Sequence, residues 1–323
     1  RGKDMLCIYC AIGQRMSSIA RIMDDLQNAR ALEFSTVIIA TEEDTPGMRF
    51  IAPYAATTLG EHFMESGRDV LVVFDDLTKH ARAYREISLL LRRPPAREAY
   101  PGDIFYIHSR MLERATHLRD DVGGGSLTAL PIVETQAQNV SAYIPTNLIS
   151  ITDGQIYVNP TLFQQGVLPA VDVGKSVSRV GGKTQLPAYR DIAKDLRLQY
   201  SQFEELEAFS RFGASLDEET EKTIARGRRV RETLKQPQYD TLAVHEQIAI
   251  LLAVSQGLFD GIELQDITEA KLRIRRVVDE QFGELHKKIA SGEKLSDDDK
   301  QHLLSSVRKE IDQMGGERHE EKG

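Results

Sequence analysis

The stretch Asp69-Val-Leu-Val-Val-Phe-Asp75-Asp76 decides the fold that this sequence predicts. An unbroken apolar run of this kind is typical of a strand covered on both faces, as in a parallel sheet. The run ends in two carboxylates. In phosphate-binding α/β proteins, a carboxylate at the carboxyl end of such a strand holds Mg²⁺, commonly through water. Asp75 is therefore a candidate metal-binding residue. The alternative is two solvated acids, one of which caps the next helix.

Similar short apolar runs recur before and after this strand and alternate with helical stretches, which indicates a parallel sheet with crossover helices. The predicted strands are Leu6–Ile12, Ser35–Ala40, Asp69–Phe74, Ile104–Tyr106, Leu127–Val133 and Leu148–Thr152. Apolar residues at helical spacing predict helices over Met16–Arg30, Ile51–Ser66 and Leu77–Leu91. Pro94-Pro95 ends the last of these.

The sequence changes character at Leu186-Pro187, where strand-like runs give way to charged stretches with a period near 3.6 residues. Ser215-Leu-Asp-Glu218 fits a capping box that opens a helix. Further helices are expected over Leu242–Gln256, Ala270–Ile289 and Asp298–Met314. We therefore predict an α/β nucleotide-type domain over residues 1–187 and an all-α domain over residues 188–323.

Composition excludes several classes of protein. The chain has 323 residues, of which 41 are basic and 49 acidic, for a formal charge of −8. This balance disfavours a nucleic-acid or anionic-membrane surface. No apolar run approaches the roughly 20 residues needed to span a bilayer, so we expect no direct membrane insertion. The eight histidines, His62, His80 and His108 among them, show no ligand spacing, and no metal other than Mg²⁺ is predicted.

The two cysteines, Cys7 and Cys10, form a Cys-x-x-Cys inside the first predicted strand. That spacing can mark a redox pair or half a metal site. Residues three apart on a strand point to opposite faces, and the sequence has no second cysteine pair. Two core cysteines in a reducing compartment are the better interpretation.

The sequence contains no phosphate loop of the form Gly-x-x-x-x-Gly-Lys-Ser/Thr. Gly174-Lys175-Ser176 fails because Pro169 occupies the first glycine position, and Gly182-Lys183-Thr184 fails because Val177 does. The chain also opens at Arg1 without an initiator methionine. We expect it to be a fragment that binds nucleotide weakly or not at all when alone.

Arg179 closes the run Pro169-Ala-Val-Asp-Val-Gly-Lys-Ser-Val-Ser-Arg179. An arginine is effectively always charged. Held rigidly, a guanidinium can stabilise the charge that develops on a transferring phosphoryl group, often in the site of a neighbouring subunit. The alternative for an isolated arginine is a helix start paired with a carboxylate.

This run resembles the signature of the alpha subunit of rotary F-type ATP synthases. Three more stretches match that family in the same order, namely Ile12-Gly-Gln14, Phe74-Asp75-Asp76 and Ile149-Ser-Ile-Thr-Asp-Gly-Gln155. The resemblance implies a RecA-like P-loop NTPase domain that lacks its amino-terminal Walker A segment, followed by a helical domain. Leu168, Gly174-Lys175 and Gly181-Gly-Lys-Thr-Gln-Leu-Pro depart from the commoner pattern and suggest the alternate F-type, or N-ATPase, branch.

The resemblance also implies roles for single residues. Gln14 stands where catalytic beta subunits carry a glutamate, and an amide cannot take a proton from water at neutral pH. Phe163, Gln236 and Gln238 match residues near the adenine of a non-catalytic nucleotide. Arg179 matches the arginine that reaches a neighbouring catalytic site. The implied cofactors are ATP or ADP with Mg²⁺.

The implied partners are a catalytic beta subunit in an alternating hexamer, the gamma subunit of the central stalk and the peripheral stalk. The complex is an ion-translocating ATP synthase at the cytoplasmic face of a bacterial membrane, and the isolated chain is expected to be inactive. Two other classes remain open. One is an autonomous RecA-like hexameric ATPase or helicase, which Gln14 and the acidic balance disfavour. The other is a structural scaffold that binds no nucleotide.

Overall fold

The computed structural model describes residues 5–210 and 217–321. The chain forms two compact units, Arg1–Asp153 and Gly154–Gly323, and each is described by itself. The predicted fold class, a parallel sheet with helices followed by a helical domain, is confirmed. None of the described helices combines the length and the apolar character that crossing a bilayer requires.

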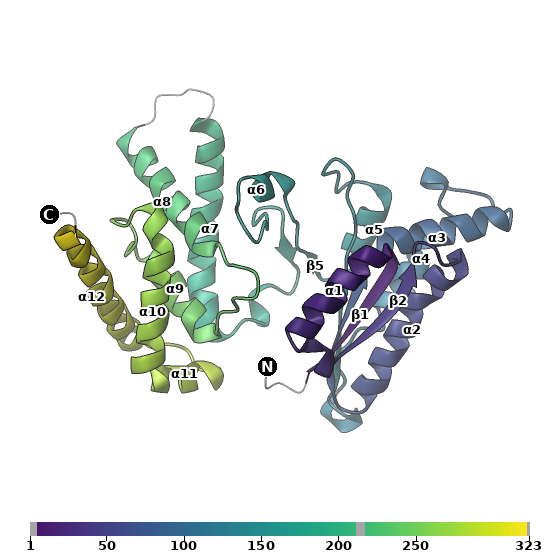
Figure 1. Ribbon diagram of the computed structural model, residues 1–323, viewed down its shortest axis with the longest axis horizontal. Coiled ribbons are helices and arrows are strands. Elements are labelled where there is room, and N and C mark those ends of the chain that lie inside the picture. The colour runs from purple at the N-terminus through teal and green to yellow at the C-terminus, as the bar shows by residue number, and fades with distance from the viewer. Residues whose placement is uncertain (1–4, 211–216, 322–323) are drawn as a thin grey trace. The chain divides into compact units, whose positions relative to one another are not determined.

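A four-stranded parallel sheet forms the centre of the first unit (Figure 1). Its spatial order is β2-β1-β3-β4, and the strands are β1 (Met5–Gln14), β2 (Ser35–Thr41), β3 (Asp69–Asp75) and β4 (Ser126–Pro131). β1 and β3 lie side by side in the middle, with Ala11 opposite Asp75. The strand on which the prediction was built is thus a central strand, as its continuous apolar run requires.

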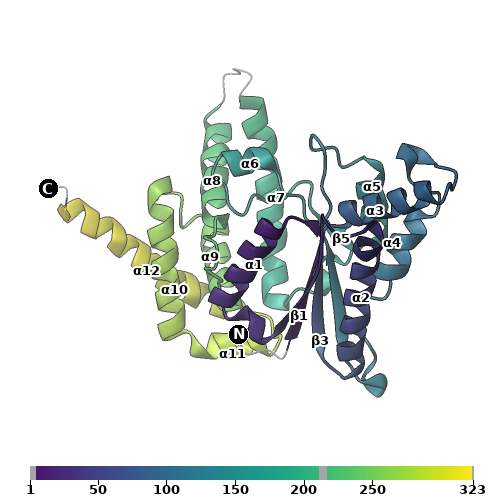
Figure 2. The ribbon, with the colours of Figure 1, turned by 45° about the vertical axis from the view of Figure 1, so that its right-hand side comes forward.

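Helices cover both faces of this sheet. The first unit contains α1 (Met16–Asn28), α2 (Pro46–Glu65), α3 (Leu77–Leu90), α4 (Ile104–Leu112) and α5 (Tyr143–Ile151). α1 lies on one face and α2 on the other, where α2 contacts all four strands (Figures 1 and 2). α2 begins where the hydroxyl of Thr45 accepts a hydrogen bond from the Met48 amide, with Pro46 in the first turn.

The core of the first unit is built from alternate residues of the central strands. Ile8, Cys10 and Ile12 of β1 and Val72 and Phe74 of β3 are almost completely buried. The other cysteine, on the opposite face of β1, is half-buried, and both thiols are free. Both cysteines lie in β1, as predicted, but only Cys10 belongs to the buried core.

Two predicted strands are wrong. Ile104–Tyr106 lies in α4 and Leu148–Thr152 lies mostly in α5. Both stretches are short and rich in β-branched or aromatic residues, which favours a strand locally. In the fold each has one buried helical face: Ile104, Ile107 and Met111 in α4, and Ile144 and Leu148 in α5. Tertiary burial at helical spacing overrides the local preference.

The second unit is dominated by helices. It contains the short strands β5 (Gly154–Gln155) and β6 (Val177–Ser178), the short helix α6 (Pro160–Gln164), and the longer helices α7 (Pro187–Ser210), α8 (Glu218–Leu234), α9 (Val244–Ser255), α10 (Ile267–Gln281), α11 (Gly283–Ala290) and α12 (Asp297–Glu321). α9 packs against α7, α8, α10, α11 and α12. It is apolar on nearly every side because it lies at the centre of the bundle.

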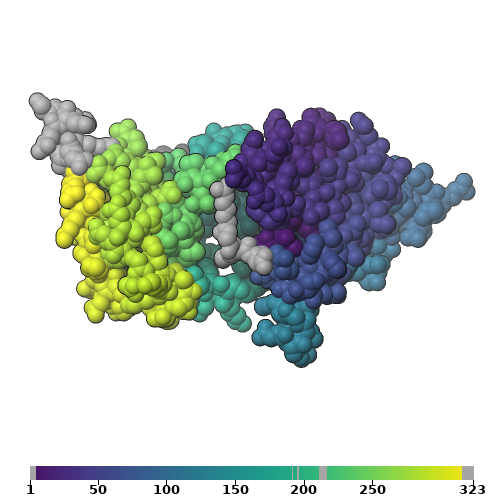
Figure 3. Space-filling view, turned by 60° about the horizontal axis from the view of Figure 1, so that its bottom comes forward, coloured from purple at the N-terminus to yellow at the C-terminus, as the bar shows by residue number. Residues whose placement is uncertain are grey.

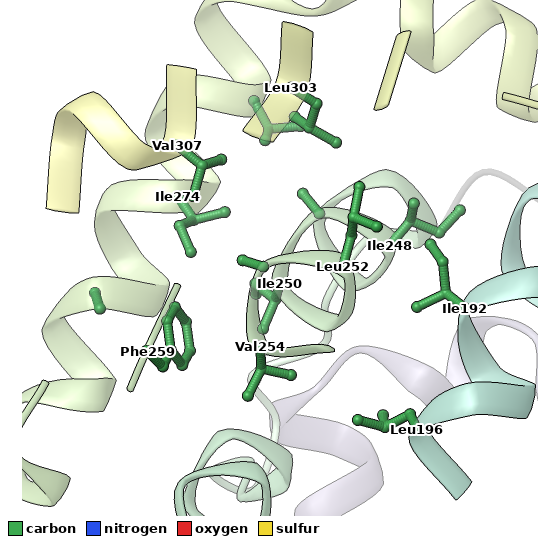
Figure 4. Packing of buried hydrophobic residues seen from close by; sticks show 14 of the residues in the cluster. Ile192, Leu196, Ile248, Ile250, Leu252, Val254, Phe259, Ile274, Leu303 and Val307 are labelled. Carbon is green, nitrogen blue, oxygen red and sulfur yellow. The ribbon is translucent and has the colours of Figure 1, made fainter. Parts of the chain in front are cut away.

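Figure 4 shows how the helices meet around α9. Ile248 and Leu252 of α9 lie near Ile192 of α7, while Ile274 of α10 lies beside Val307 of α12 (Figure 4). In the space-filling view, the yellow residues of α12 lie along the yellow-green residues of α10 (Figure 3). The buried side chains of this unit therefore form one continuous core.

α7 and α8 approach each other closely at Gly227. A Cβ atom at this glycine would lie 2.0 Å from Cγ of Phe203, whose side chain is completely buried. The crossing of these two helices therefore depends on the absence of a side chain at Gly227.

Several helix boundaries in the structure differ from those predicted from the sequence. The capping box at Ser215 lies partly outside the described residues, and the described cap of α8 is Asp217, which accepts a hydrogen bond from the Thr220 amide. The predicted helix Ala270–Ile289 is two helices that meet at Phe282. In the chain, the boundary between the compact units falls between Asp153 and Gly154. The domain boundary at residue 187 rests on the change in composition and stays a prediction.

Candidate functional site

The carboxyl ends of β1 and β3 bring Gln14 and Asp75 together. A bulge at Gly13, whose φ is +63°, turns the end of β1 toward its neighbour. The amide nitrogen of Gln14 donates to Oδ1 of Asp75 at 2.7 Å, and the hydroxyl of Tyr9 donates to Oδ2 at 2.5 Å. Both carboxylate oxygens of Asp75 are thus held by donors from β1.

Lys79, in the first turn of α3, completes this cluster. Its ammonium nitrogen donates to Oε1 of Gln14 at 3.0 Å and lies 3.3 Å from Oδ2 of Asp76 and 3.7 Å from Oε1 of Glu134. Gln14 thus donates from its amide nitrogen and accepts at its amide oxygen, and this pair of bonds sets the orientation of the amide. The stem of Lys79 packs over Gly13, where a Cβ would meet it at 3.2 Å.

The two strand-end carboxylates have different surroundings. Asp76 is 1% exposed and caps α3 by accepting from the Lys79 amide at 2.8 Å. Burial raises the pKa of Asp76, and the hydrogen bonds and charge of Lys79 act in the opposite direction. Asp75 is half-buried. Burial and the bond to Asp75 raise the pKa of Tyr9, so its phenol remains a donor.

The donor set at Asp75 fits a Mg²⁺ ion held through water. Each oxygen of Asp75 accepts one hydrogen bond from Tyr9 or Gln14 and keeps further lone-pair capacity. A carboxylate oriented in this way can accept hydrogen bonds from the water shell that Mg²⁺ retains. Gln14 is a weaker candidate than Asp75, because its amide oxygen is neutral and lies 3.0 Å from the Lys79 ammonium, which would repel a second cation.

In the second unit, the signature that ends at Arg179 is held by its own side chains. Asp172, which is 9% exposed, accepts from the amide nitrogen of Asn159 at 3.1 Å and from the backbone of Lys175 at 3.0 Å. The hydroxyl of Ser176 donates to the Asp172 carbonyl at 2.6 Å and accepts from the Tyr157 amide at 3.0 Å. These bonds fix the chain immediately before β6.

Arg179 follows β6, where Ser178 pairs with Gly154 of β5. The residue is exposed. The hydroxyl of Ser178 accepts from the Gly181 amide at 3.1 Å, which closes the turn around the arginine. Arg179 thus lies at the surface of the second unit, directly after the antiparallel pair of β5 and β6.

The residues predicted to lie near an adenine base only partly come together. Gln236 and Gln238 line a pocket of about 250 Å³, and Leu168 lies in its wall together with Lys271. The backbone amide of Gln236 donates to the Leu168 carbonyl at 2.9 Å. Its side-chain amide donates to the Asp240 carbonyl at 2.5 Å. Gln236 is therefore tied to the loops that form the pocket wall, and its side-chain oxygen keeps its capacity to accept.

Phe163 is not among the residues that line this pocket. It lies in α6 and is 64% exposed. The backbone amide of Gly166, which does line the pocket, donates to the Phe163 carbonyl at 3.0 Å. The aromatic ring is therefore a surface group close in the chain to the pocket wall, and its part in base binding stays a prediction.

Sequence reasoning missed Tyr9, Lys79 and Glu134 at the strand-end cluster. Lys79 lies 65 residues from Gln14 along the chain, and no local pattern links them. A weak signal was present, because Lys79 stands three residues after Asp76, the spacing at which a first-turn residue meets a helix cap.

Two sequence families match this chain. The nucleotide-binding domain of the ATP synthase alpha/beta family matches residues 1–178, and the C-terminal domain of the ATP synthase alpha/beta chain matches residues 185–310. The parallel sheet and its strand-end cluster lie within the first match, which continues into the second unit as far as β6, and helices α7 to α11 lie within the second match. The chain belongs to the ATP synthase alpha/beta family.

Within that family, the chain is similar to alpha subunits. It is 63% identical to ATP synthase subunit alpha 2 of Syntrophus aciditrophicus, over 96% of this chain and 60% of that protein. It is 62% identical to subunit alpha 2 of Albidiferax ferrireducens, over 95% and 58%, and 61% identical to subunit alpha 1 of Rhodopirellula baltica, over 94% and 59%. The chain spans about 60% of the length of these curated relatives.

Proposed function

We propose that this chain is part of a non-catalytic alpha subunit in the head of a rotary ATP synthase. In this role it binds ATP or ADP with Mg²⁺ at an interface with a beta subunit, and it supplies Arg179 to the catalytic site of a beta subunit. The gamma subunit of the central stalk and the peripheral stalk are its further partners. The assembly couples ion flow to ATP synthesis or hydrolysis at the cytoplasmic face of a bacterial membrane.

The observation that carries this proposal is the arrangement of Gln14. A catalytic site needs a group at this strand end that accepts a proton from the attacking water. Gln14 is an amide whose nitrogen donates to Asp75 and whose oxygen accepts from Lys79. It therefore offers no base for the attacking water, which supports binding of nucleotide without hydrolysis at this site.

The surroundings of Arg179 support its proposed role. The hydrogen bonds of Asp172 and Ser176 hold the chain before β6, and the Ser178 hydroxyl closes the turn after it. A charged group that is oriented before the reaction stabilises developing charge without a reorganisation cost. Because Arg179 is exposed in this unit, a neighbouring subunit can contact it.

The test is Arg179→Ala in the complete subunit, reconstituted with its beta and gamma partners. We expect ATP turnover to fall by about 10³–10⁵-fold, the range for loss of an arginine finger, while the hexamer still assembles. Lys183→Ala is the matched control. Lys183 is exposed, and its substitution removes one positive charge a few positions from Arg179. Turnover near the unmodified level in Arg179→Ala would contradict the proposed role, as would an equal loss in Lys183→Ala.

A further inference from the structure

Three helices of the second unit bring two histidines and an aspartate together. His245 lies in α9, Asp279 in α10 and His286 in α11. Nε2 of His245 lies 3.0 Å from Oδ1 of Asp279, and the two imidazole rings are stacked with centroids 3.4 Å apart. Each residue offers one ligand atom, and these three atoms all lie within 4.8 Å of one another.

His286 carries a nitrogen that the surrounding fold does not use. Its Nε2 atom is buried and has no hydrogen-bond partner among the described residues. A neutral imidazole can bind a metal ion through such a nitrogen.

The charges around the cluster suit a cation. The Asp279 side chain is 57% exposed and that of His245 is 21% exposed, so an ion and its water ligands have a path from solvent. Glu246, the residue after His245, is buried and paired with Arg275, with Nε and Oε1 2.6 Å apart. The charge of Glu246 is therefore balanced by Arg275, and Asp279 is the carboxylate of the cluster that can bind a cation.

We propose that His245, Asp279 and His286 form a binding site for a divalent transition-metal ion. Two imidazoles and one carboxylate are the ligand types that Zn²⁺ takes in sites with three protein ligands and a water in the fourth position. With bonds of about 2.0–2.2 Å, the ligand atoms of a tetrahedral ion lie roughly 3.3 Å apart. The three ligand atoms lie within 4.8 Å of one another, so side-chain rotation has to bring them to the separation that this geometry requires.

Such an ion would join α9, α10 and α11 through a single centre. α11 is short, and α10 ends at Gln281 just before it. An ion that binds the folded unit and not the unfolded chain stabilises the fold as its concentration rises above the dissociation constant. The proposed site shares no residue with the nucleotide site or with Arg179, so it extends the proposed function without depending on it.

The test is titration of the 323-residue chain with Zn²⁺, followed by calorimetry, and with Co²⁺, followed by its visible absorption. We expect one bound ion, and with Co²⁺ the intense absorption of a four-coordinate site. His286→Gln and Asp279→Asn should each lower the affinity for Zn²⁺ at least about 100-fold, since even residues that only orient metal ligands contribute about 10–100-fold.

Two variants control for binding elsewhere. His62→Gln removes an exposed histidine of the first unit, and Cys7→Ser removes the half-buried thiol. Both should bind Zn²⁺ as the unmodified chain does. The proposal is overturned if the chain takes up no ion, if the His286→Gln and Asp279→Asn variants keep full affinity, or if a control variant loses it. Far-ultraviolet circular dichroism of each variant separates a lost ligand from a lost fold.

Discussion

At the scale of single residues, the Gln14 amide shows how a strand end can be fixed in a form unsuited to proton transfer. Its two hydrogen bonds run in opposite senses, one to the Asp75 carboxylate and one from the Lys79 ammonium. Only a group that both donates and accepts can make both bonds. A carboxylate at this position would lose the donor and face a second carboxylate at hydrogen-bond distance.

This geometry predicts the effect of Gln14→Glu. The new carboxylate would lie about as close to Asp75 as the present amide, which is 2.7 Å away, and like charges at that distance favour a shared proton. In the folded state this pair binds a proton more tightly than the unfolded chain does. The free energy of unfolding should therefore decrease as the pH rises from about 5 to about 8.

Urea unfolding at several pH values measures this effect. Gln14→Ala is the control, because it removes the same two hydrogen bonds without adding a charge, and its loss of stability should not grow with pH. A loss of stability that stays the same across that pH range would contradict the expected carboxylate repulsion.

The buried histidine pair of the first unit predicts sensitivity to acid. His80 and His108 are both completely buried, and Nδ1 of His80 lies 3.2 Å from Nε2 of His108. Nε2 of His80 lies 3.1 Å from the Phe50 carbonyl, which can only accept, so His80 carries its proton on Nε2 and accepts from His108. Burial lowers the pKa of His80 to about 4 and that of His108 to about 3.

Because these pKa values lie below the ordinary 6.5, the unfolded chain binds protons first as the pH falls. The first unit is then most stable above about pH 6.5 and loses up to about 1.4 kcal/mol per pH unit for each histidine between about pH 6.5 and about pH 4. His108→Gln removes one of the two titrating groups and should make the decline shallower. Urea unfolding followed by hydrogen exchange in α3 and α4 measures it; an unchanged slope in the variant would contradict the assignment.

At the scale of helices and strands, the close crossing of α7 and α8 gives a further prediction. Gly227→Ala places a methyl group 2.0 Å from Phe203, and backbone shifts of this kind cost about 1–3 kcal/mol or more. Thermal or urea unfolding should show that loss. Gly283→Ala is the control, because a Cβ there meets nothing within 4 Å.

A second substitution distinguishes overpacking from other causes. Phe203→Leu shortens the side chain that faces Gly227, so the double variant should be less destabilised than the sum of the two single variants. Additive losses would mean that the methyl group and the ring do not compete for the same space.

The helices and strands also show how much of the fold could be predicted from the sequence. β1, β3 and α9 could be predicted because each is buried on nearly every side and its composition follows from that. α4 and α5 could not, since Ile104-Phe-Tyr-Ile107 and Leu148-Ile-Ser-Ile-Thr152 favour strands locally and become helices through tertiary burial. The pattern of apolar residues therefore predicts a helix or strand correctly only where local sequence, and not tertiary burial, decides its type.

Some residues of the candidate site could likewise be predicted from the sequence, and others could not. Asp75 and Gln14 could each be named from the sequence, and the parallel sheet brings these two strand ends together, with the Gln14 amide 2.7 Å from Asp75. The bond from Lys79 to Gln14 could not, because the two residues are far apart in the chain and no motif joins them. The cluster of His245, Asp279 and His286 is likewise invisible in sequence, since three different helices supply it.

At the scale of the whole molecule, the two compact units have separate hydrophobic cores. One core contains buried residues from Ile8 to Leu148, and the other contains buried residues from Ala188 to Met314. A chain with two cores need not unfold in one step. We therefore expect two transitions in urea, one for each unit.

Single substitutions assign these transitions. Gly227→Ala should lower the midpoint of one transition, and His108→Gln should alter the pH dependence of the other. Hydrogen exchange measured by mass spectrometry reports which segments open in each step. A single transition that both variants shift together would show that the two cores unfold as one cooperative unit.

The scarcity of two residue types makes this chain convenient for optical labelling. It contains no tryptophan and only the two cysteines of β1. Burial raises the pKa of Cys10 to about 12 and also raises that of Cys7, and a thiol reacts only as its thiolate. A maleimide dye should therefore attach to an introduced surface cysteine, as in Lys183→Cys, far faster than to either native thiol. A single introduced tryptophan would be the only indole in the chain, so one unit can carry the dye and the other the tryptophan without removal of a native cysteine.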